Sequence, residues 1–197
     1  MLGLKATKER QQVNPVLKKS AELDLEPRER GVDLFKTLSV YNFSFWFDGR
    51  TAKLVLAVEP PLVAVVNVEG SAVVYGANQM TSTDAEDRLL HALGLNEDLS
   101  VFHAVASSDP LLASFSRDWR GWRLRSTDLW WALVTAVCQQ NASFRQGWTM
   151  LYRLVKLFGR TAMLEGLGEV LLPPRPKDVL AEVQLLRRAG LGYRAET

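Results

Sequence analysis

The sequence predicts an α+β fold in which a small antiparallel β-sheet domain is followed by a helical domain. Between Leu34 and Gln79 the apolar residues recur at strand-like spacing, and six valines lie between Val55 and Val68, a composition typical of half-buried strands. From Thr83 onward the spacing of the apolar residues becomes helical. A hydrophobic content of 47% over 197 residues supports a substantial core.

Three parts are expected along the chain. Residues 1–30 are polar and charged and contain Pro15 and Pro27, so they are predicted to form a flexible arm. Residues 31–82 form the predicted sheet domain, and residues 83–197 form the predicted helical domain.

The sheet domain is expected to contain four strands. Alternation of Phe43, Phe45 and Phe47 predicts the first strand, and the Asp48-Gly49 pair is a strong signal for a hairpin turn after it. The return strand ends at a Glu-Pro-Pro segment, because proline cannot donate to a strand ladder. The three remaining strands are predicted at 52–58, 62–68 and 71–75.

The helical domain is expected to begin with a helix that Thr83 caps and Gly94 ends. A second helix starts near Ser100, and Asp109-Pro110 opens a third helix that reaches Phe115. Residues 119–125 are predicted to be an irregular connector rich in Trp and Arg. Further along, we expect a loop rich in Gly and Pro at 159–176 and a last helix that ends at Gly190, with an apolar stripe formed by Leu180, Val183, Leu186 and Ala189.

Two central helices meet at a polar corner, which is the most informative feature of the sequence. The stripe of Leu129, Leu133 and Val137 predicts that the first of these helices is buried. Ser143 and Gln146 fit a capping box at the start of the second helix. The corner between them holds polar residues, which is favourable only where it faces water or a polar ligand.

Composition limits the class of protein. The two parts of the chain differ in charge: residues 1–116 hold 11 basic and 15 acidic residues, and residues 117–197 hold 13 basic and 7 acidic residues. A basic second part fits a phosphate-bearing partner, although an ordinary solvated surface is the alternative. No stretch of about 18 apolar residues occurs, so we expect no membrane partner. The single cysteine, Cys138, excludes an internal disulfide and is expected to be a buried thiol.

Three segments together resemble the helix-hairpin-helix superfamily of DNA glycosylases, and within it the 8-oxoguanine and 3-methyladenine DNA glycosylases. They are Gly121-Trp122-Arg123-Leu124-Arg125-Ser126-Thr127-Asp128, the Cys138-Gln139-Gln140-Asn141 corner, and Leu191-Gly192-Tyr193-Arg194-Ala195. The resemblance covers roughly Phe35 to Thr197 and is strongest after Asp109. It implies a partial form of that fold, with DNA bound across the junction of the sheet domain and the helical domain.

The resemblance also implies a DNA-binding site. Its residues are Gln139, Gln140, Asn141, Ser143, Arg145, Tyr193 and Arg194. Asn141 would fill the void left by an extruded base, Tyr193 would wedge into the adjacent base step, and Arg194 would hydrogen-bond the orphaned base. Structural alternatives stay open: Asn141 as a helix end, Tyr193 as a core residue, and the two glutamines as a solvated last turn.

The resemblance implies that catalysis is incomplete in these 197 residues. The superfamily's Leu-Pro-Gly-x-Gly hairpin and catalytic Asp follow the Gly-Tyr-Arg element, and neither occurs here. We therefore expect no catalytic residue in this chain and a second polypeptide that carries both. Residues 39–43 lack the glycine that oxidised-guanine enzymes often place there. One cysteine cannot hold an iron–sulfur cluster, and His91 and His103 lack metal-ligand spacing, so neither a cofactor nor a metal is expected.

The leading interpretation is a DNA-binding component of a base-excision-repair glycosylase for modified purines in double-stranded DNA. It would act in the cytoplasm at the nucleoid, or in a nucleus. The alternatives are a non-catalytic DNA-binding remnant and a protein-interaction module.

Overall fold

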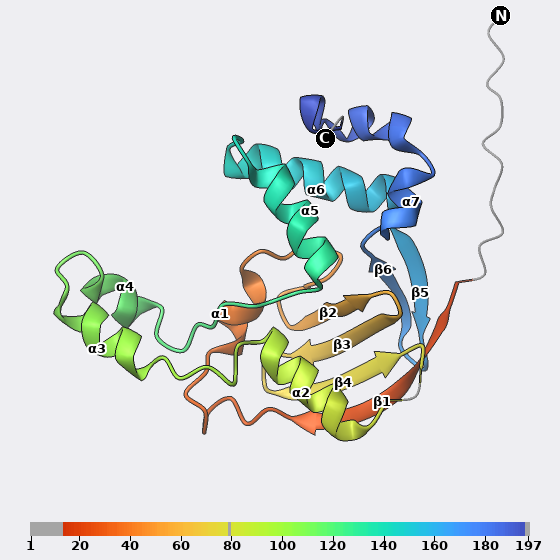
Figure 1. The fold of residues 1–197 in the computed structure, drawn as a ribbon. Coiled ribbons are helices and arrows are strands. Elements are labelled where there is room, and N and C mark those ends of the chain that lie inside the picture. Colours follow the sequence, from red (N-terminus) through yellow and green to blue (C-terminus); the bar gives the residue numbers. More distant parts are fainter. Residues whose placement is uncertain (1–13, 79, 196–197) are drawn as a thin grey trace, which may run out of the picture.

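A computed structural model of the chain describes residues 14–78 and 80–195. It combines one six-stranded sheet with helices, which confirms the predicted α+β class (Figure 1). The strand order is β2-β3-β4-β1-β5-β6. Neighbouring strands are antiparallel except for β1 and β5, which are parallel. The strands are β1 (Val16–Asp24), β2 (Thr51–Val58), β3 (Pro61–Asn67), β4 (Ser71–Gly76), β5 (Arg160–Leu164) and β6 (Gly168–Leu172).

The helices gather into three groups. Helices α1 and α2 pack on the sheet, α3 and α4 form a hairpin that stands away from it, and the C-terminal helices lie together above it (Figure 1). The α-helices are α1 (Leu34–Ser39), α2 (Ser82–Ala92), α3 (Ser100–Ser108), α4 (Ala113–Asp118), α5 (Leu129–Gln139), α6 (Phe144–Phe158) and α7 (Pro176–Leu180). Two 3₁₀ helices follow, η1 (Val183–Ala189) and η2 (Gly192–Ala195). None of the helices within the described ranges is long and apolar enough to cross a membrane.

The predicted flexible arm is wrong for residues 16–24, which form strand β1 between β4 and β5. Leu17 and Ala21 are buried in this strand. The register shifts between Lys19 and Ala21, so the inward-facing residues do not follow the period of two that identifies a strand in a sequence. Residues 1–13 of the predicted arm lie outside the described residues.

The predicted strand at 43–47 is a turn instead. The amides of Trp46 and Phe47 both donate to the carbonyl of Phe43, and only an isolated bridge joins Phe47 to Ala52. The aromatic side chains here pack against one another, as in the Phe43–Phe45 and Phe43–Trp46 pairs, and do not alternate between the two faces of a sheet. The turn signal itself was correct: Asp48 Oδ1 accepts hydrogen bonds from the amides of Arg50 and Thr51.

The predicted loop at 159–176 and the predicted single helix up to Gly190 are also wrong. β5 and β6 form a hairpin within the loop, and β5 continues the sheet beyond β1. The sheet therefore takes strands from outside residues 31–82. α7 and the 3₁₀ helix η1 replace the single helix, and their Leu180 and Val183 are exposed, whereas Ala189 is buried.

Two helix starts differ from the prediction. Thr81, not Thr83, caps α2, because its hydroxyl oxygen accepts a hydrogen bond from the backbone amide of Asp84. Asp109 accepts the amides of Leu111 and Leu112 in a turn, so α4 begins only at Ala113.

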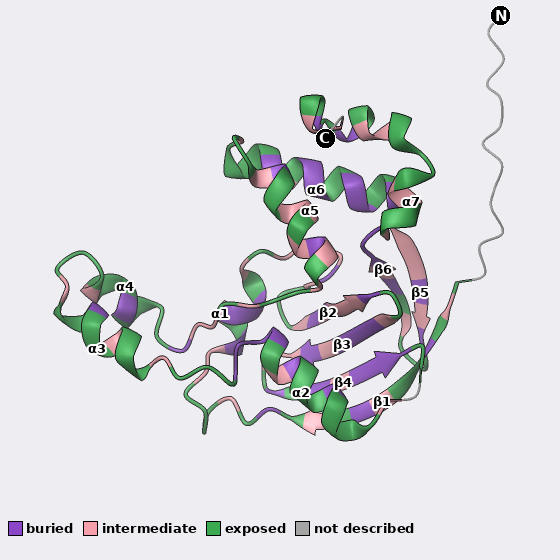
Figure 2. Ribbon diagram, viewed as in Figure 1, coloured by how far each residue is buried: buried purple, intermediate pink, exposed green. Residues whose placement is uncertain are grey.

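The α5 helix is buried on a different face from the predicted one. Trp131 and Cys138 face the core, whereas Leu129 and Leu133 are 75% and 54% exposed. The buried face packs on α6, where Leu151, Leu154, Val155 and Phe158 are buried. The α3–α4 hairpin is largely exposed (Figure 2). Its exposed residues include large apolar side chains: Val101, Phe102, Val105, Leu111, Leu112 and Phe115.

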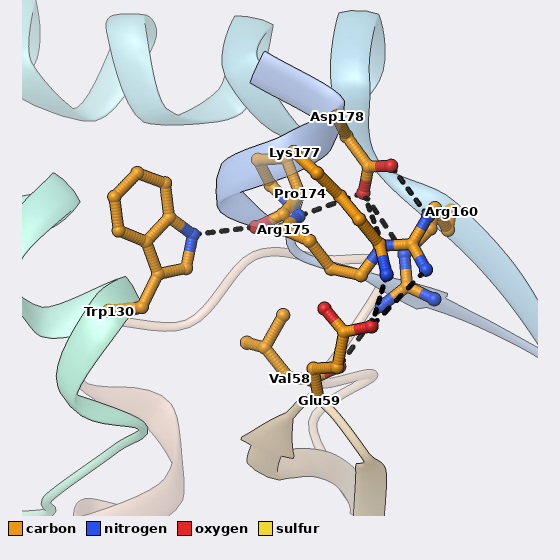
Figure 3. A network of polar contacts seen from close by, with 8 residues as sticks. All are labelled: Val58, Glu59, Trp130, Arg160, Pro174, Arg175, Lys177 and Asp178. Carbon is orange, nitrogen blue, oxygen red and sulfur yellow. Dashed lines mark hydrogen bonds and ion pairs between the residues drawn. The ribbon is translucent and has the colours of Figure 1, made fainter. Parts of the chain in front are cut away.

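A polar network joins the helical part of the chain to the sheet (Figure 3). Asp178 on α7 accepts two side-chain hydrogen bonds from Arg175, at 2.6 and 2.9 Å, and pairs with Arg160 of β5 at 3.2 Å. Arg160 also donates to the carbonyl of Val58 at the end of β2. Glu59, in the next turn, pairs with Lys177 and Arg175. The network thus fixes α7 against the ends of β2 and β5.

Candidate nucleic-acid interface

The α5–α6 corner has the geometry that the sequence predicted. Gln140 caps the C-terminus of α5, and Asn141 follows with φ of 49°, a left-handed conformation that Asn adopts more readily than most residues. Ser143 then caps α6 in a complete capping box with Gln146. Asn141 therefore occupies the left-handed position directly after the C-cap of α5. Its side chain also stands exposed at the tip of the corner.

The two glutamines of the corner have different environments. Gln140 is exposed. Gln139 is half-buried against α6, and a Cβ atom on Gly147 would lie 2.3 Å from its Oε1. Its Nε2 is buried with no hydrogen-bond acceptor among the described residues. Gln139 therefore packs between α5 and α6 and stabilises the corner. Gln140 and Asn141 are exposed to solvent.

The C-terminal turn docks on this corner. Arg194 donates from Nη2 to the carbonyl of Gln140, and its guanidinium lies 4.7 Å from the centre of the Tyr193 ring. Tyr193 is exposed, so its alternative role as a core residue is wrong. Buried Ala189 and Leu191 anchor the turn beneath these side chains. Two segments that are far apart in the sequence thus form one surface.

Cys138 lies directly beneath the corner and is fully buried. Burial raises the pKa of its thiol to about 11, against a smaller lowering by Arg194. The thiol is therefore protonated at neutral pH, which confirms the expected buried thiol and argues against a nucleophile.

The two segments that meet at the corner carry charges of one sign. No acidic residue occurs between Gln139 and Arg160 or between Val183 and Ala195. These segments carry exposed cations at Arg145, Arg153, Lys156, Arg187 and Arg188. Such a surface attracts a polyanion, and Arg suits phosphate geometry.

Aromatic rings continue from the corner toward the loop before β2, a feature that the sequence reasoning missed. Phe144 stacks with Trp148 at 5.7 Å, and Trp148 stacks with Phe43 at 4.0 Å. Tyr41 contacts Phe144 and Trp148 edge-on. The alternating Phe residues were the available signal, but they were interpreted as a strand.

A cavity of about 370 Å³ opens beside these rings, between the loop at 40–46, β2 and α5. Arg125 lies in its wall and donates from Nη2 to the carbonyls of Val40 and Tyr41. Burial lowers the pKa of Arg125 to about 10, so its guanidinium remains charged at neutral pH.

Three acidic residues in the second part of the chain, Asp128, Glu165 and Asp178, make contacts elsewhere in the fold. Asp128 caps α5 and accepts the amide of Val58, and Glu165 accepts the amide of Lys19. Asp178 belongs to the network with Arg160 and Arg175. In the described part of the chain, no three His, Cys, Asp or Glu side chains come together as a metal site would require.

Sequence comparison with protein families found no match, and comparison with curated proteins found none either. Solved structures do resemble the chain. The 3-methyladenine DNA glycosylase from Archaeoglobus fulgidus matches with a TM-score of 0.70 and 19% identity, over 89% of this chain and 63% of that one. MBOgg1 in complex with a low-affinity DNA ligand matches with a TM-score of 0.61 and 24% identity, over 84% of this chain and 56% of that one.

A third structure, the apo-form of the 8-oxoguanine glycosylase/lyase from Clostridium acetobutylicum, matches with a TM-score of 0.52 and 16% identity. The match covers 79% of this chain and 57% of that enzyme. The chain therefore has a fold similar to that of DNA glycosylases, and it spans less than two thirds of the length of these three structures.

Proposed function

We propose that this chain is the DNA-binding component of a base-excision-repair glycosylase that acts on a modified purine in double-stranded DNA. The observation that carries the proposal is the corner itself. An exposed Asn141 in a left-handed conformation stands at the junction of two packed helices, and Arg194 joins the Tyr193 turn to it. The similarity in fold to DNA glycosylases supports the reaction class.

The geometry suggests how the corner would act. An enzyme that removes a base must first extrude it from the stack, which costs a few kcal/mol. Asn141 would enter the space left in the duplex, and Tyr193 would stack on the neighbouring base, where stacking contributes ~1–3 kcal/mol. Arg194 would hold the orphaned base. The backbone phosphates would contact Gln140, Ser143 and Arg145, while Gln139 supports the corner.

We further propose that the catalytic Asp and the hairpin motif are supplied from outside these 197 residues, by a second polypeptide. The exposed apolar faces of α3, α4 and α5 support a partner surface, because large exposed apolar patches are rare on soluble monomers. The complex would act on DNA in the cytoplasm or in a nucleus. The exposed apolar surface of α3 and α4 is also consistent with the alternative function, a protein-interaction module that does not bind DNA.

The preference for damaged DNA tests the corner. Tyr193→Ala is expected to weaken binding to a duplex with an abasic site by about tenfold, as the loss of one base stack would. Asn141→Ala is expected to weaken it by about fivefold, as the loss of one hydrogen bond in the opened duplex would. Binding to an intact duplex should stay nearly unchanged, because phosphate contacts are common to both. Fluorescence anisotropy on both duplexes measures this. Equal losses on the two duplexes would mark the residues as structural, and no DNA binding would favour the interaction module.

The division of labour between two chains has its own test. The pure chain should release no base from duplexes with oxidised or alkylated purines, because the catalytic Asp that the resemblance implies does not occur in these residues. Adding a polypeptide that carries the hairpin motif and the catalytic Asp should produce abasic sites. Base release by the chain alone, measured on alkali-treated gels, would contradict the proposal and direct attention to Asp128, Glu165 and Asp178.

A further inference from the structure

A second cavity, of about 450 Å³, opens beside the polar network that joins α7 to the sheet. Its wall combines the turn between β2 and β3, the start of β5 and the residue before α7, which place Glu59, Arg160 and Arg175 in the lining (Figure 3). Small-molecule sites occupy about 300–1,000 Å³. The cavity is separate from the corner, because it lies at the C-terminal end of α6, whereas Asn141 precedes the N-terminal end, about 22 Å away along this helix of 15 residues.

Among the described residues, the network beside this cavity holds three cations and two carboxylates. Glu59 pairs with Lys177. Asp178 is shared by Arg160 and Arg175, whose side chains are only 9% and 17% exposed. Burial lowers the pKa of Arg160, and the charge of Arg175 lowers it further, against the opposing effect of the two carboxylates. The network thus carries one positive charge more than its carboxylates neutralise, and because the two guanidinium groups are largely buried, this excess favours the binding of an anion.

The two guanidinium groups do not use all their donors within the described chain. Arg175 donates from Nε and Nη2 to Asp178, but its Nη1 lies 3.6 Å from Glu59 Oε1, which is too far for a hydrogen bond. Arg160 donates from Nη2 to the carbonyl of Val58 at 3.0 Å. Its Nε lies 3.2 Å from Asp178 and makes no hydrogen bond to a described residue. Guanidinium groups with spare donors suit the oxygens of a phosphate, which accept forked hydrogen bonds.

We propose that this cavity binds a phosphate monoester, whose oxygens accept hydrogen bonds from Arg160 and Arg175. Two neutral polar residues, Asn78 and Thr161, also line the cavity, and the Pro60–Pro61 pair provides an apolar wall for the group that carries the phosphate. A phosphate ion alone would fill only a small part of the volume. The proposal does not depend on the function of the corner, because the phosphate can belong to a free nucleotide or to the 5′ end of a DNA strand.

Glu59 gives this site a property that distinguishes it from a simple cationic patch. The carboxylate lines the same cavity, and the hydrogen bond from Lys177 lowers its pKa, so it is charged at neutral pH and opposes a phosphate. Glu59→Gln should therefore tighten phosphate binding by about fivefold, as the removal of one like charge at about 4 Å in water predicts. A misfolded variant cannot gain affinity, so this change tests the site even if other variants disturb the network.

The test measures the binding of deoxyadenosine monophosphate, inorganic phosphate and deoxyadenosine to the whole chain by isothermal titration calorimetry at constant ionic strength. The nucleotide should bind, inorganic phosphate should bind more weakly, and the nucleoside should not bind. The nucleotide should also raise Tm, since a ligand of the native state stabilises it. No binding of the nucleotide, or equal binding of the nucleoside, would overturn the proposal. Equal affinities for the nucleotide and inorganic phosphate would refute the part assigned to the apolar wall.

Matched variants assign the binding to the cavity. Arg175→Gln should weaken nucleotide binding by about 10- to 100-fold, as the loss of a hydrogen bond to a charged group predicts, and Arg175→Lys should recover part of it, because it keeps the charge without the fork. Arg50→Gln is the control, since Arg50 is exposed, pairs with Glu69 and lies outside the cavity lining. Urea unfolding verifies that each variant is folded. Unchanged affinity in Arg175→Gln, together with no gain in Glu59→Gln, would refute the site.

Duplexes with and without 5′-phosphates identify the source of the phosphate. If a DNA end occupies the cavity, the phosphorylated duplex should bind more tightly, and Arg175→Gln should abolish the difference. If a free nucleotide occupies it, the two duplexes should bind alike, and the nucleotide and a duplex should bind together, because the cavity and the corner lie at opposite ends of α6. Failure of the wild type to prefer an abasic duplex would refute the function of the corner and leave this site intact.

Discussion

Replacing Asp178 with asparagine is expected to lower the free energy of unfolding by about 3 kcal/mol, the lower end of the cost of breaking a buried ion pair. The Asp178 side chain is only 15% exposed and contacts two arginines. Its loss would remove the carboxylate that Arg160 and Arg175 share and leave Glu59 as the remaining carboxylate of the network (Figure 3). Urea unfolding followed by circular dichroism measures the change. Asp118→Asn is the control, since the Arg117–Asp118 pair is exposed and should contribute about 0.5 kcal/mol or less.

The same carboxylate predicts how stability depends on pH. Burial raises the pKa of Asp178, but hydrogen bonds from the side chain and backbone of Arg175 outweigh it, so the net pKa lies below the ordinary value of 3.8. A group with a lowered pKa stabilises the fold above its unfolded pKa and loses this contribution as the pH falls through its folded pKa. The difference between wild type and Asp178→Asn should therefore be constant above ~pH 5 and shrink in stronger acid. A difference that grows on acidification would contradict the network.

Gly147→Ala is expected to destabilise the protein by about 2 kcal/mol, within the usual cost of overpacking, and to remove the preference for abasic DNA. A Cβ atom at this position would lie 2.3 Å from Gln139 Oε1 and 2.9 Å from the Cys138 carbonyl oxygen. The side chain of Gln139 can move, but the carbonyl belongs to the backbone of α5. The two helices must therefore separate, which displaces Asn141 and the docked Arg194.

The sign of the Gly147 effect is informative. In an exposed helix, Gly→Ala would stabilise by about 1 kcal/mol through propensity alone, so destabilisation reports the close approach of α5. Thr149→Ala, at an exposed position on the same helix, serves as the control for general effects on α6. A stabilised Gly147→Ala variant with normal DNA binding would show that the corner tolerates a wider spacing of its helices.

The corner was predictable from the sequence because its signals are local. Ser143 and Gln146 are three residues apart and form their capping box without help from the rest of the chain. The strands from Thr51 to Gly76 were likewise predictable, because each pairs with its neighbour in the sequence and presents a regular pattern of valines.

The features that could not be predicted depend on distant partners. β1 is polar and irregular in register, and only its neighbours β4 and β5 make it a strand. The aromatic cluster misled the prediction because Phe43 and Trp46 pack on Trp148 and Trp131 of the helical part, which local alternation cannot reveal. The cavity could not be predicted from local sequence either, because its wall combines segments near residues 40, 55, 125 and 135.

The central place of β1 has a consequence for how the molecule assembles during synthesis. β1 can pair with β4 once β4, which ends at Gly76, has emerged, and this gives a local four-stranded sheet with β2 and β3. Its other edge must wait for β5, because Val16 pairs with Met163. That edge stays open while the helices are being translated, and late, non-local pairing is slow and exposed to wrong partners. Lys18, Lys19 and Glu22 lie along β1, and charged residues on an open strand edge disfavour pairing with another chain.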